Sequence, residues 1–145
     1  MAKKHIAAPH VIVVDDEAPV RNLVRRMLEP AGYLVEEARN PQEACAMAEK
    51  IPQLDLLVSD FQMPELTGGE VARRIRIAKP NVRVLFITGY ADHLFDERQA
   101  LWDGEAFLEK PFSRRGLLEA ASLVLFGRLN EEDRFASRTA AAGGA

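Results

Sequence analysis

The side chains best suited to chemistry in this chain are three carboxylates, one hydroxyl and one ammonium group, each close behind a run of apolar residues. They belong to Asp15, Asp16, Asp60, Thr88 and Lys110. Carboxylates that lie together repel one another and require a cation, and oxygen ligands without His or Cys favour Mg²⁺. A lysine and a threonine fit a phosphoryl group beside such a metal, and a carboxylate can attack that group to form an aspartyl phosphate. These residues therefore predict a magnesium-dependent phosphoryl site.

Five short apolar stretches must deliver these side chains. Their lengths and their β-branched residues favour strands, and the unbroken apolar runs are typical of strands buried on both faces of a parallel sheet. The predicted strands comprise residues 11–14, 33–35, 54–58, 82–87 and 106–108.

Helical patterns lie between the predicted strands. The first has one buried face with apolar residues at i, i+3, i+4, i+7 and i+8. These residues are Val20, Leu23, Val24, Met27 and Leu28. A second helix begins after Asn40, with Pro41 at its first position. Residues 69–78 and 92–101 form a third helix and a polar fourth, and Ser113 caps a fifth.

Strands that alternate with helices in this way predict an α/β fold, a doubly wound five-stranded parallel sheet flanked by five helices. In the flavodoxin-like order 2-1-3-4-5, strand 2 lies at an edge and the other four strands end at one mouth, where such sheets bind ligands. The domain is predicted to occupy residues 10–127. An arm of residues 1–9 precedes it, and residues 128–145 are expected to be a frayed helix running into disorder.

The composition argues against several other classes. The 145 residues carry 19 Lys and Arg against 22 Asp and Glu, so the net charge of −3 gives no footprint for nucleic acid. No apolar run approaches the ~20 residues that span a bilayer, and the first residues lack the apolar core of a secretory signal. The single cysteine, Cys45, excludes an internal disulfide and a cysteine-based zinc site. We expect a cytoplasmic protein that binds neither nucleic acid nor membrane.

A family resemblance rests on five motifs that occur in a fixed order, at or just after the ends of the predicted strands. They are Asp15-Asp16, Asp60, Met63-Pro64 with Gly68, Thr88, and Lys110-Pro111-Phe112. This set resembles the receiver domain of two-component response regulators, and the resemblance covers about residues 10–127. The residues after it are too few for a DNA-binding or catalytic domain, so the chain resembles the single-domain type.

The resemblance implies that Asp60 accepts a phosphoryl group from a phosphohistidine on a histidine kinase or a histidine phosphotransfer protein. Asp15 and Asp16 would hold Mg²⁺ together with Asp60 and the main-chain carbonyl of Gln62, and Lys110 would contact the phosphoryl group. Such a module assists its own phosphorylation and dephosphorylation. It is not an enzyme that turns over an external substrate.

The resemblance also implies a switch. Thr88 would move its hydroxyl toward the phosphate, Phe107 would change rotamer with it, and the surface of helix 4, strand 5 and helix 5 would signal to a partner protein. Phosphorylation would thereby shift a pre-existing two-state equilibrium. Gln62 and Tyr90 occupy positions that the family uses to set the lifetime of the phosphoryl group.

Several features depart from the common family pattern. Gly89 replaces the usual alanine after Thr88, and Thr67 stands where an aspartate is common. Residues 101–106 lack the common Gly-Ala signature and, together with residues 86–90, are similar to receivers attached to hybrid histidine kinases. Both a stand-alone receiver and a receiver taken from a hybrid kinase are consistent with the sequence.

Two other functions stay open at this point. A phosphate-independent interaction module of the same fold needs none of the acids, Thr88 or Lys110, so their presence argues against it. A phosphohydrolase with an aspartyl intermediate places a general acid two residues after its nucleophile, where this chain has Gln62. The pair Asp15-Asp16 can also cap a helix, and Phe107 can be a core residue.

Two surface clusters complete the sequence-based predictions. Arginines and a lysine on the third helix are interpreted as a solvated face: Arg73, Arg74, Arg76 and Lys79. Apolar residues off the buried helix faces suggest, as a hypothesis, a homodimer or partner contact. These are Leu94, Phe95, Trp102, Leu123 and Phe126.

Overall fold

Five parallel strands form the central sheet of the structure, a computed structural model that describes residues 8–89 and 104–127. They are β1 (His10–Val14), β2 (Leu34–Ala38), β3 (Leu56–Asp60), β4 (Arg83–Thr88) and β5 (Glu105–Glu109). Their order in the sheet is β2-β1-β3-β4-β5, and every neighbouring pair is parallel. The predicted fold class and strand order are therefore confirmed.

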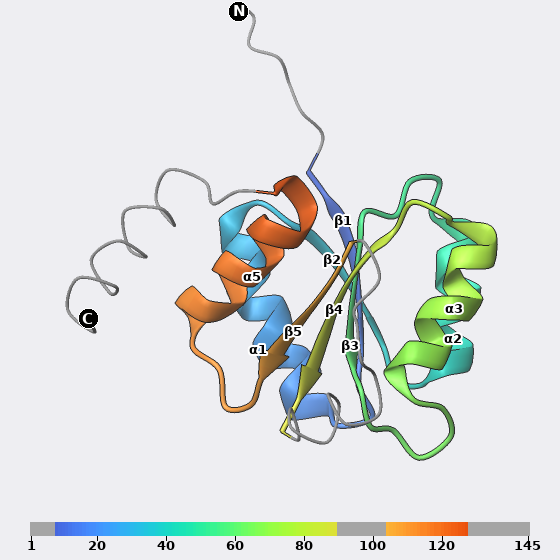
Figure 1. The fold of residues 1–145 in the computed structure, drawn as a ribbon, viewed down its shortest axis with the longest axis horizontal. Helices are drawn as coiled ribbons and strands as arrows, with labels where there is room; N and C mark the ends of the chain where they lie inside the picture. Colours follow the sequence, from blue (N-terminus) through green and yellow to red (C-terminus); the bar gives the residue numbers. More distant parts are fainter. Residues whose placement is uncertain (1–7, 90–103, 128–145) are drawn as a thin grey trace, which may run out of the picture.

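Helices cover both faces of this sheet (Figure 1). In chain order they are α1 (Ala18–Leu28), the 3₁₀ turn η1 (Glu29–Ala31), α2 (Pro41–Lys50), α3 (Gly68–Ala78) and α5 (Arg114–Phe126). Helices α1 and α5 pack on one face, and α2 and α3 pack on the other (Figure 1). The predicted helix of residues 92–101, most of the arm of residues 1–9 and the tail of residues 128–145 lie outside the described residues.

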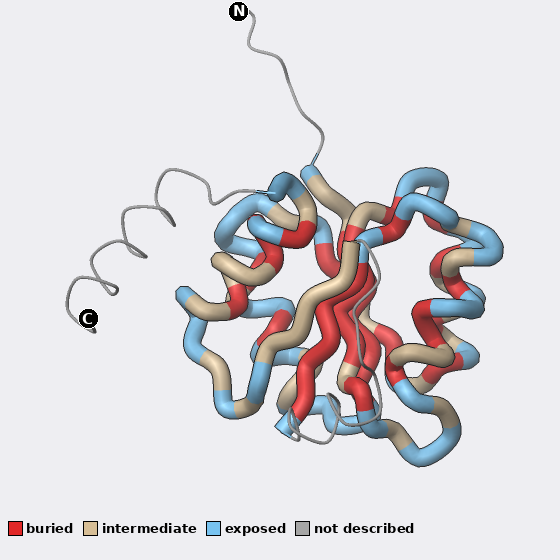
Figure 2. The backbone as a smooth tube through the Cα atoms, in the orientation of Figure 1, coloured by how far each residue is buried: buried red, intermediate tan, exposed pale blue. Residues whose placement is uncertain are grey.

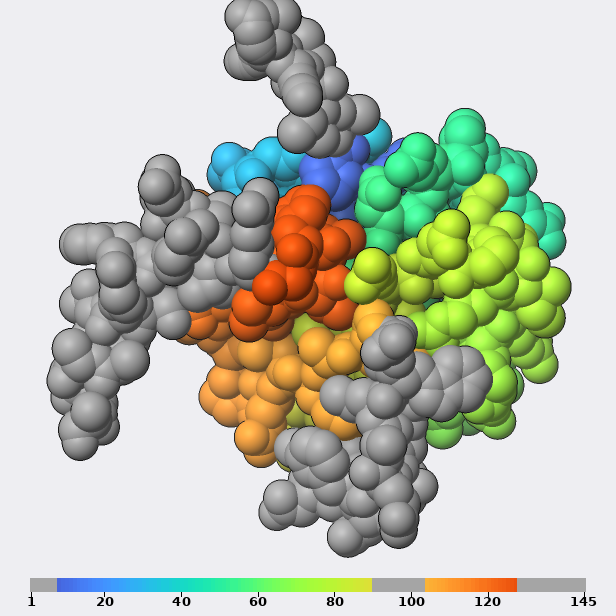
Figure 3. Space-filling model, turned by 45° about the horizontal axis from the view of Figure 1, so that its top comes forward, coloured from blue at the N-terminus to red at the C-terminus, as the bar shows by residue number. Residues whose placement is uncertain are grey.

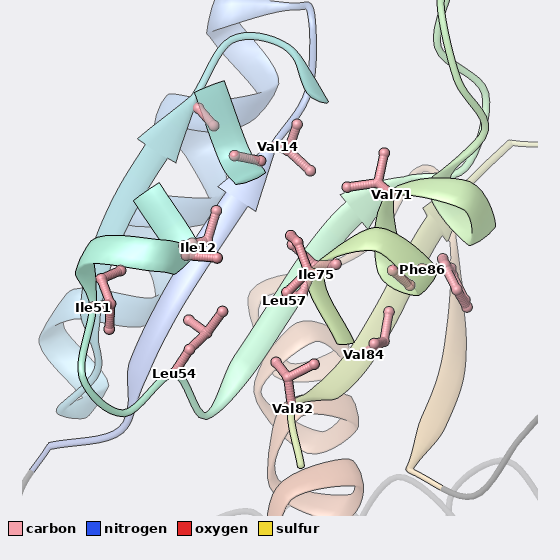
Figure 4. Packing of buried hydrophobic residues seen from close by; sticks show 14 of the residues in the cluster. Ile12, Val14, Ile51, Leu54, Leu57, Val71, Ile75, Val82, Val84 and Phe86 are labelled. Carbon is pink, nitrogen blue, oxygen red and sulfur yellow. The ribbon is translucent and has the colours of Figure 1, made fainter. Parts of the chain in front are cut away.

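The sheet separates two hydrophobic cores, because successive side chains on a strand point to opposite faces. On β1, Ile12 and Val14 belong to the core under α2 and α3, whereas Val11 and Val13 belong to the core under α1 and α5. Figure 4 shows the first of these cores, and Figure 2 shows that the central strands of the sheet are buried, whereas β5 at its edge is only partly buried. Burial on both faces explains the unbroken apolar runs of the sequence.

Local side-chain caps start three of the helices. The side chain of Asn40 accepts a hydrogen bond from the Glu43 N–H, and the Ser113 hydroxyl accepts one from the N–H three residues further on. Thr67 and Glu70 form a capping box, in which each side chain accepts a hydrogen bond from the main-chain N–H of the other residue. These caps fix where α2, α3 and α5 leave the loops that surround the sheet.

Several strand boundaries differ from the predicted ones. Strand β2 begins after Tyr33 and continues through Glu36 and Glu37, and β3 begins after Leu54 and extends to Asp60. The polar residues of β2 stay in register with β1, so the ladder continues beyond the apolar run. Hydrogen bonding between strands, rather than hydrophobicity, sets these ends.

The buried stripe of α1 is narrower than the sequence predicts. The side chain of Leu23 is 43% exposed, so its assignment to the buried face was wrong, whereas Val24 and Leu28 are fully buried. The core under α1 includes Val24 and Leu28 but not Leu23.

Two details of α3 differ from the sequence analysis. The helix begins at Gly68, one residue before the predicted range of 69–78. Arg76 does not belong to a solvated basic face. Its Nη1 atom lies 3.0 Å from Glu105 Oε2 of β5, and only 15% of the Arg76 side chain and 2% of the Glu105 side chain are exposed. This ion pair joins α3 to the first residue of β5.

The revised stripe of α1 is testable with two identical substitutions on one helix. Leu28→Ala removes a fully buried side chain and should lower the free energy of unfolding by about 2–5 kcal/mol. Leu23→Ala removes a half-exposed side chain and should lower it by less than about 1 kcal/mol. Urea unfolding followed by circular dichroism measures both. Equal losses of unfolding free energy in the two variants would contradict the assignment of Leu28 to the buried face and of Leu23 to the exposed one.

Candidate functional site

Chemically active side chains meet at the carboxyl edge of the sheet. Asp15 and Asp16 follow β1, Asp60 ends β3, and one carboxylate oxygen of each lies within 4.8 Å of the other two. Thr88 ends β4 and is buried. Lys110 follows β5, with its Nζ atom 3.7 Å from Asp60 Oδ2 and 3.9 Å from Asp15 Oδ2. Four strands thus bring together the five residues that the sequence analysis selected.

An open hollow of about 440 Å³ leads to these groups. Its lining consists of Asp16, Glu17, Asp60, Gln62, Thr88, Gly89 and Lys110. A larger hollow of about 670 Å³ lies at the opposite, amino-terminal edge of the sheet, beside Pro9, Leu34 and Phe126. We place the chemistry at the smaller hollow, because the carboxylates and the ammonium group converge only there in the described part of the chain.

Main-chain hydrogen bonds fix Asp60 on the floor of the hollow. The Phe61 N–H donates to the carbonyl of Ile87 in β4, at 3.0 Å, and its own carbonyl accepts from the Gly68 N–H at 2.7 Å. The Gln62 N–H donates to Asp60 Oδ1 at 3.2 Å. The carboxylate therefore stands on a backbone that is tied to a neighbouring strand and to the start of α3.

The segment that carries Asp15 is held on several sides. The Asp15 N–H donates to the carbonyl of Ala38 at the end of β2 at 3.3 Å, and Asp15 Oδ1 accepts from the Glu17 N–H at 2.8 Å. The main-chain carbonyl of Asp15 accepts from Arg21 Nη1 at 2.8 Å. Glu17, rather than the Asp pair, is the N-cap residue of α1, and its side chain makes no capping bond. The acids are therefore not used as helix caps.

Lys110 reaches the acids because β5 continues its pairing with β4 to the edge of the sheet. The Lys110 N–H donates to the carbonyl of Thr88 at 2.8 Å, and the peptide bond between Lys110 and Pro111 is cis. The Phe107 ring lies on β5 against Phe86, with ring centroids 5.6 Å apart. Phe107 thus packs at the border of the core, and Tyr90 lies outside the described residues.

Burial dominates the electrostatics of the acids. It raises the pKa of Asp15 from 3.8 to about 6, with a further rise from Asp60, against the opposing effects of the Glu17 N–H and Lys110. Burial also raises the pKa of Asp60, while Lys110 and the Gln62 N–H oppose that rise. The single positive charge of the Lys110 ammonium group does not neutralise the negative charges of three carboxylates. The donor set, all oxygen and partly buried, fits a hard divalent cation such as Mg²⁺.

Comparison with known proteins decides the family. The family model for the response regulator receiver domain matches residues 11–122, which is most of the chain and includes all five strands apart from His10 at the start of β1. The chain belongs to the response regulator receiver family. Receiver domains are signalling modules of two-component systems that interact with histidine kinases or phosphotransfer proteins. In the described residues of this receiver, no helix has the length and apolar character needed to cross a membrane.

The curated relatives that this receiver matches differ widely in length. It is 36% identical over 116 residues to the sensor kinase CckA of Brucella abortus, covering 79% of this chain and 12% of CckA. It is 30% identical over 115 residues to the response regulator receiver protein CpdR of the same organism, covering 79% of this chain and 95% of CpdR. The chain spans 12% to 56% of the length of CckA and of three other curated relatives.

A solved structure supports the same assignment. TrrA of Thermotoga maritima, crystallised in complex with Mg²⁺ and BeF, matches this receiver with a TM-score of 0.70 and 29% identity. The match covers 81% of this chain and 99% of that structure. This chain therefore shares its fold with a receiver that was crystallised with these ligands.

Two residues near the site escaped the sequence analysis. Glu17 lines the hollow, and its position directly after the Asp pair could have suggested this. Arg21 contacts the Asp15 carbonyl from α1 and belongs to none of the motifs. Its role depends on the helix meeting the loop in space.

Because the pKa of Asp15 is raised, the stability of the folded protein should depend on pH in an unusual way, which can be tested. The folded protein holds a proton on Asp15 up to about pH 6, whereas the unfolded chain releases it near pH 3.8, so stability should fall as the pH rises between these values. Thermal melts with EDTA from pH 4 to 7 should show this fall in the wild type. Asp15→Asn should reduce this fall and leave the part due to Asp60, whose pKa is also raised, and Asp55→Asn at the opposite edge of the sheet serves as the control. Parallel profiles for wild type and Asp15→Asn would contradict the assignment.

The tight packing of Gly68 under the site gives another prediction. A Cβ atom at Gly68 would lie 2.8 Å from the Asp60 carbonyl oxygen and 3.0 Å from the Phe61 Cα, whereas one at Gly89 would meet nothing within 4 Å. Gly68→Ala should therefore lower the free energy of unfolding by about 1–3 kcal/mol, because the backbone under Asp60 must shift. Gly89→Ala should change it by less than about 0.5 kcal/mol. Chemical denaturation of both variants checks this, and a neutral Gly68→Ala would argue against the close approach.

Proposed function

We propose that this receiver accepts a phosphoryl group on Asp60 from a phosphohistidine, on a histidine kinase or a histidine phosphotransfer protein, in a Mg²⁺-dependent reaction. The observation that best supports this proposal is that the carboxylate of Asp60 is both accessible from the hollow and close to the ammonium group of Lys110. It lines the hollow, its side chain is 11% exposed, and its Oδ2 atom lies 3.7 Å from Lys110 Nζ. Asp15 does not line the hollow, and Asp16 has no contact with Lys110 in the described residues.

Group transfer at this geometry is a displacement at phosphorus. An Asp60 oxygen forms the new bond as the phosphorus–nitrogen bond breaks, and the electron pair of that bond returns to the imidazole, which takes up a proton. Lys110 offsets negative charge on the phosphoryl oxygens. The residues that would hold Mg²⁺ are Asp15, Asp16, Asp60 and the Gln62 carbonyl, and the ion would neutralise charge on the acids and the phosphoryl group.

The same proposal includes a response to phosphorylation. The hydroxyl of Thr88, which ends β4 beside Asp60, would move to the new phosphoryl group, and Phe107 would repack against Phe86. Gln62, which lines the hollow, and Tyr90 would set the lifetime of the aspartyl phosphate. The receiver would in this way assist its own phosphorylation and dephosphorylation.

The proposed output surface includes β5 and α5, which lie side by side on one face of the molecule (Figure 3). Leu123 and Phe126 of α5 are 49% and 54% exposed, which suits a contact with a downstream protein or a second copy of the chain. Leu94, Phe95 and Trp102, the other members of the predicted apolar patch, lie outside the described residues.

The cellular setting is also part of the proposal. The likeness to a solved receiver domain from the hybrid histidine kinase CckA and the likeness to CpdR suit attached and stand-alone receivers alike. Both settings would place the phosphoryl exchange in the cytoplasm. Nothing in the fold or the comparisons favours a phosphate-independent module, and Gln62 does not supply the acid that a phosphohydrolase needs.

Intact-protein mass spectrometry tests the phosphoacceptor directly. After incubation with Mg²⁺ and a small acyl phosphate, the wild type should gain one phosphoryl group. Asp60→Asn, or wild type with EDTA, should gain none. Asp55→Asn is the matched control, because Asp55 lies at the opposite edge of the sheet and should leave the gain unchanged.

An adduct on Asp60→Asn would contradict the assignment. If the wild type gains nothing, a beryllofluoride titration followed by amide NMR separates a short lifetime from a silent site. Shifts around Asp60 would uphold the proposal, and an unchanged spectrum would overturn it in favour of the phosphate-independent module.

A further inference from the structure

We propose that Arg21 of α1, held by Glu37 of β2, is a positioning residue for the metal-binding acids. It would orient Asp16 through the main chain rather than touch the metal or the phosphoryl group. This inference rests on the proposed Mg²⁺-dependent function and adds to it a residue outside the motifs that define the site.

The guanidinium group of Arg21 joins two elements on either side of the acid loop. Its Nη1 atom donates to the main-chain carbonyl of Asp15 at 2.8 Å, and its Nε atom lies 3.3 Å from Glu37 Oε1. Only 12% of the Arg21 side chain and 16% of the Glu37 side chain are exposed. Hydrogen bonds from an ionised donor are short and strong, and partial burial shields this one from competition by water.

The bond to the Asp15 carbonyl matters because that carbonyl belongs to the peptide unit that leads into Asp16. Asp15 has a further restraint, since its carboxylate accepts from the Glu17 N–H. The carboxylate of Asp16 is exposed and makes no hydrogen bond within the described residues. Its position is therefore set by the orientation of its backbone, and Arg21 is the side chain that fixes the preceding peptide plane.

Glu37 keeps Arg21 in place. A partly buried cation needs a nearby carboxylate, and Glu37 supplies it from the strand at the edge of the sheet. Arg25 Nη1 also reaches Glu37, at 3.2 Å, and Arg25 pairs with Glu29 on its own helix. Arg25 shares the Glu37 anchor but does not touch the acid loop, which makes it the natural comparison for Arg21.

The test is the affinity of the full-length chain for Mg²⁺ alone, measured by amide NMR titration with magnesium chloride. Substitution of a partner that orients metal ligands typically weakens metal binding 10–100-fold, so Arg21→Ala should weaken Mg²⁺ binding about tenfold. Arg25→Ala and the exposed Arg26→Ala should bind Mg²⁺ as the wild type does. Arg21→Lys, which can serve only one of the two partners at a time, should give an intermediate loss.

A double-mutant comparison separates positioning from a general structural role. If Arg21 acts through Asp16, the losses from Arg21→Ala and Asp16→Asn should not add, because the second substitution removes the group that the first one misplaces. Additive losses would overturn the proposal. A lower melting temperature with unchanged Mg²⁺ affinity in Arg21→Ala, or in Arg21→Lys should the alanine variant not fold, would also overturn it.

The outcomes also separate this inference from the proposed function. If the wild type binds Mg²⁺ and Arg21→Ala binds it equally well, the role of Arg21 is wrong and the proposed function stands. If the wild type shows no Mg²⁺ binding, the Mg²⁺-dependent function fails and the role of Arg21 falls with it.

Discussion

The crowding of three carboxylates at one edge of a parallel sheet is the constraint on which the rest of this structure depends. Desolvation and mutual repulsion oppose ionisation of Asp15 and Asp60, and the single ammonium group of Lys110 offsets only part of that cost. The folded protein therefore stores unfavourable electrostatic energy at this edge. A divalent cation would relieve it and would also offset the negative charge that a phosphoryl group brings, so the same crowding that costs stability favours cation binding.

The surrounding architecture keeps these acids from moving apart. The two central strands, β1 and β3, carry them, and those strands are buried by helices on both faces (Figure 1). Around the acids, main-chain groups provide most of the restraint: Ala38 and Glu17 hold Asp15, while Gln62 holds Asp60. Arg21 extends this framework by linking the acid loop to the edge strand. Preorganisation of this kind means that little rearrangement is needed when the ligands bind.

On its other side the site is bordered by β4 and β5. Thr88 and Phe107 lie on these neighbouring strands, and Phe107 packs against Phe86 at the border of the core. The ion pair between Arg76 and Glu105 ties the start of β5 to α3, at the opposite end of the strand from Lys110. A strand anchored at one end and bonded to the site at the other is well placed to report on the site. This connection suits the proposed response to phosphorylation, in which Thr88 and Phe107 would change position.

The sequence by itself determined the alternation of strands and helices, hence the sheet and the edge at which Asp15, Asp16, Asp60, Thr88 and Lys110 meet. Periodicity and strand ends are local properties, and parallel topology converts them into a common site. Only the tertiary structure decided the exposure of Leu23, the pairing of Arg76 with Glu105, the close approach at Gly68 and the reach of Arg21 to Asp15. The physical reason is that each of these depends on the distance between elements packed in space. A single segment of sequence does not encode that distance.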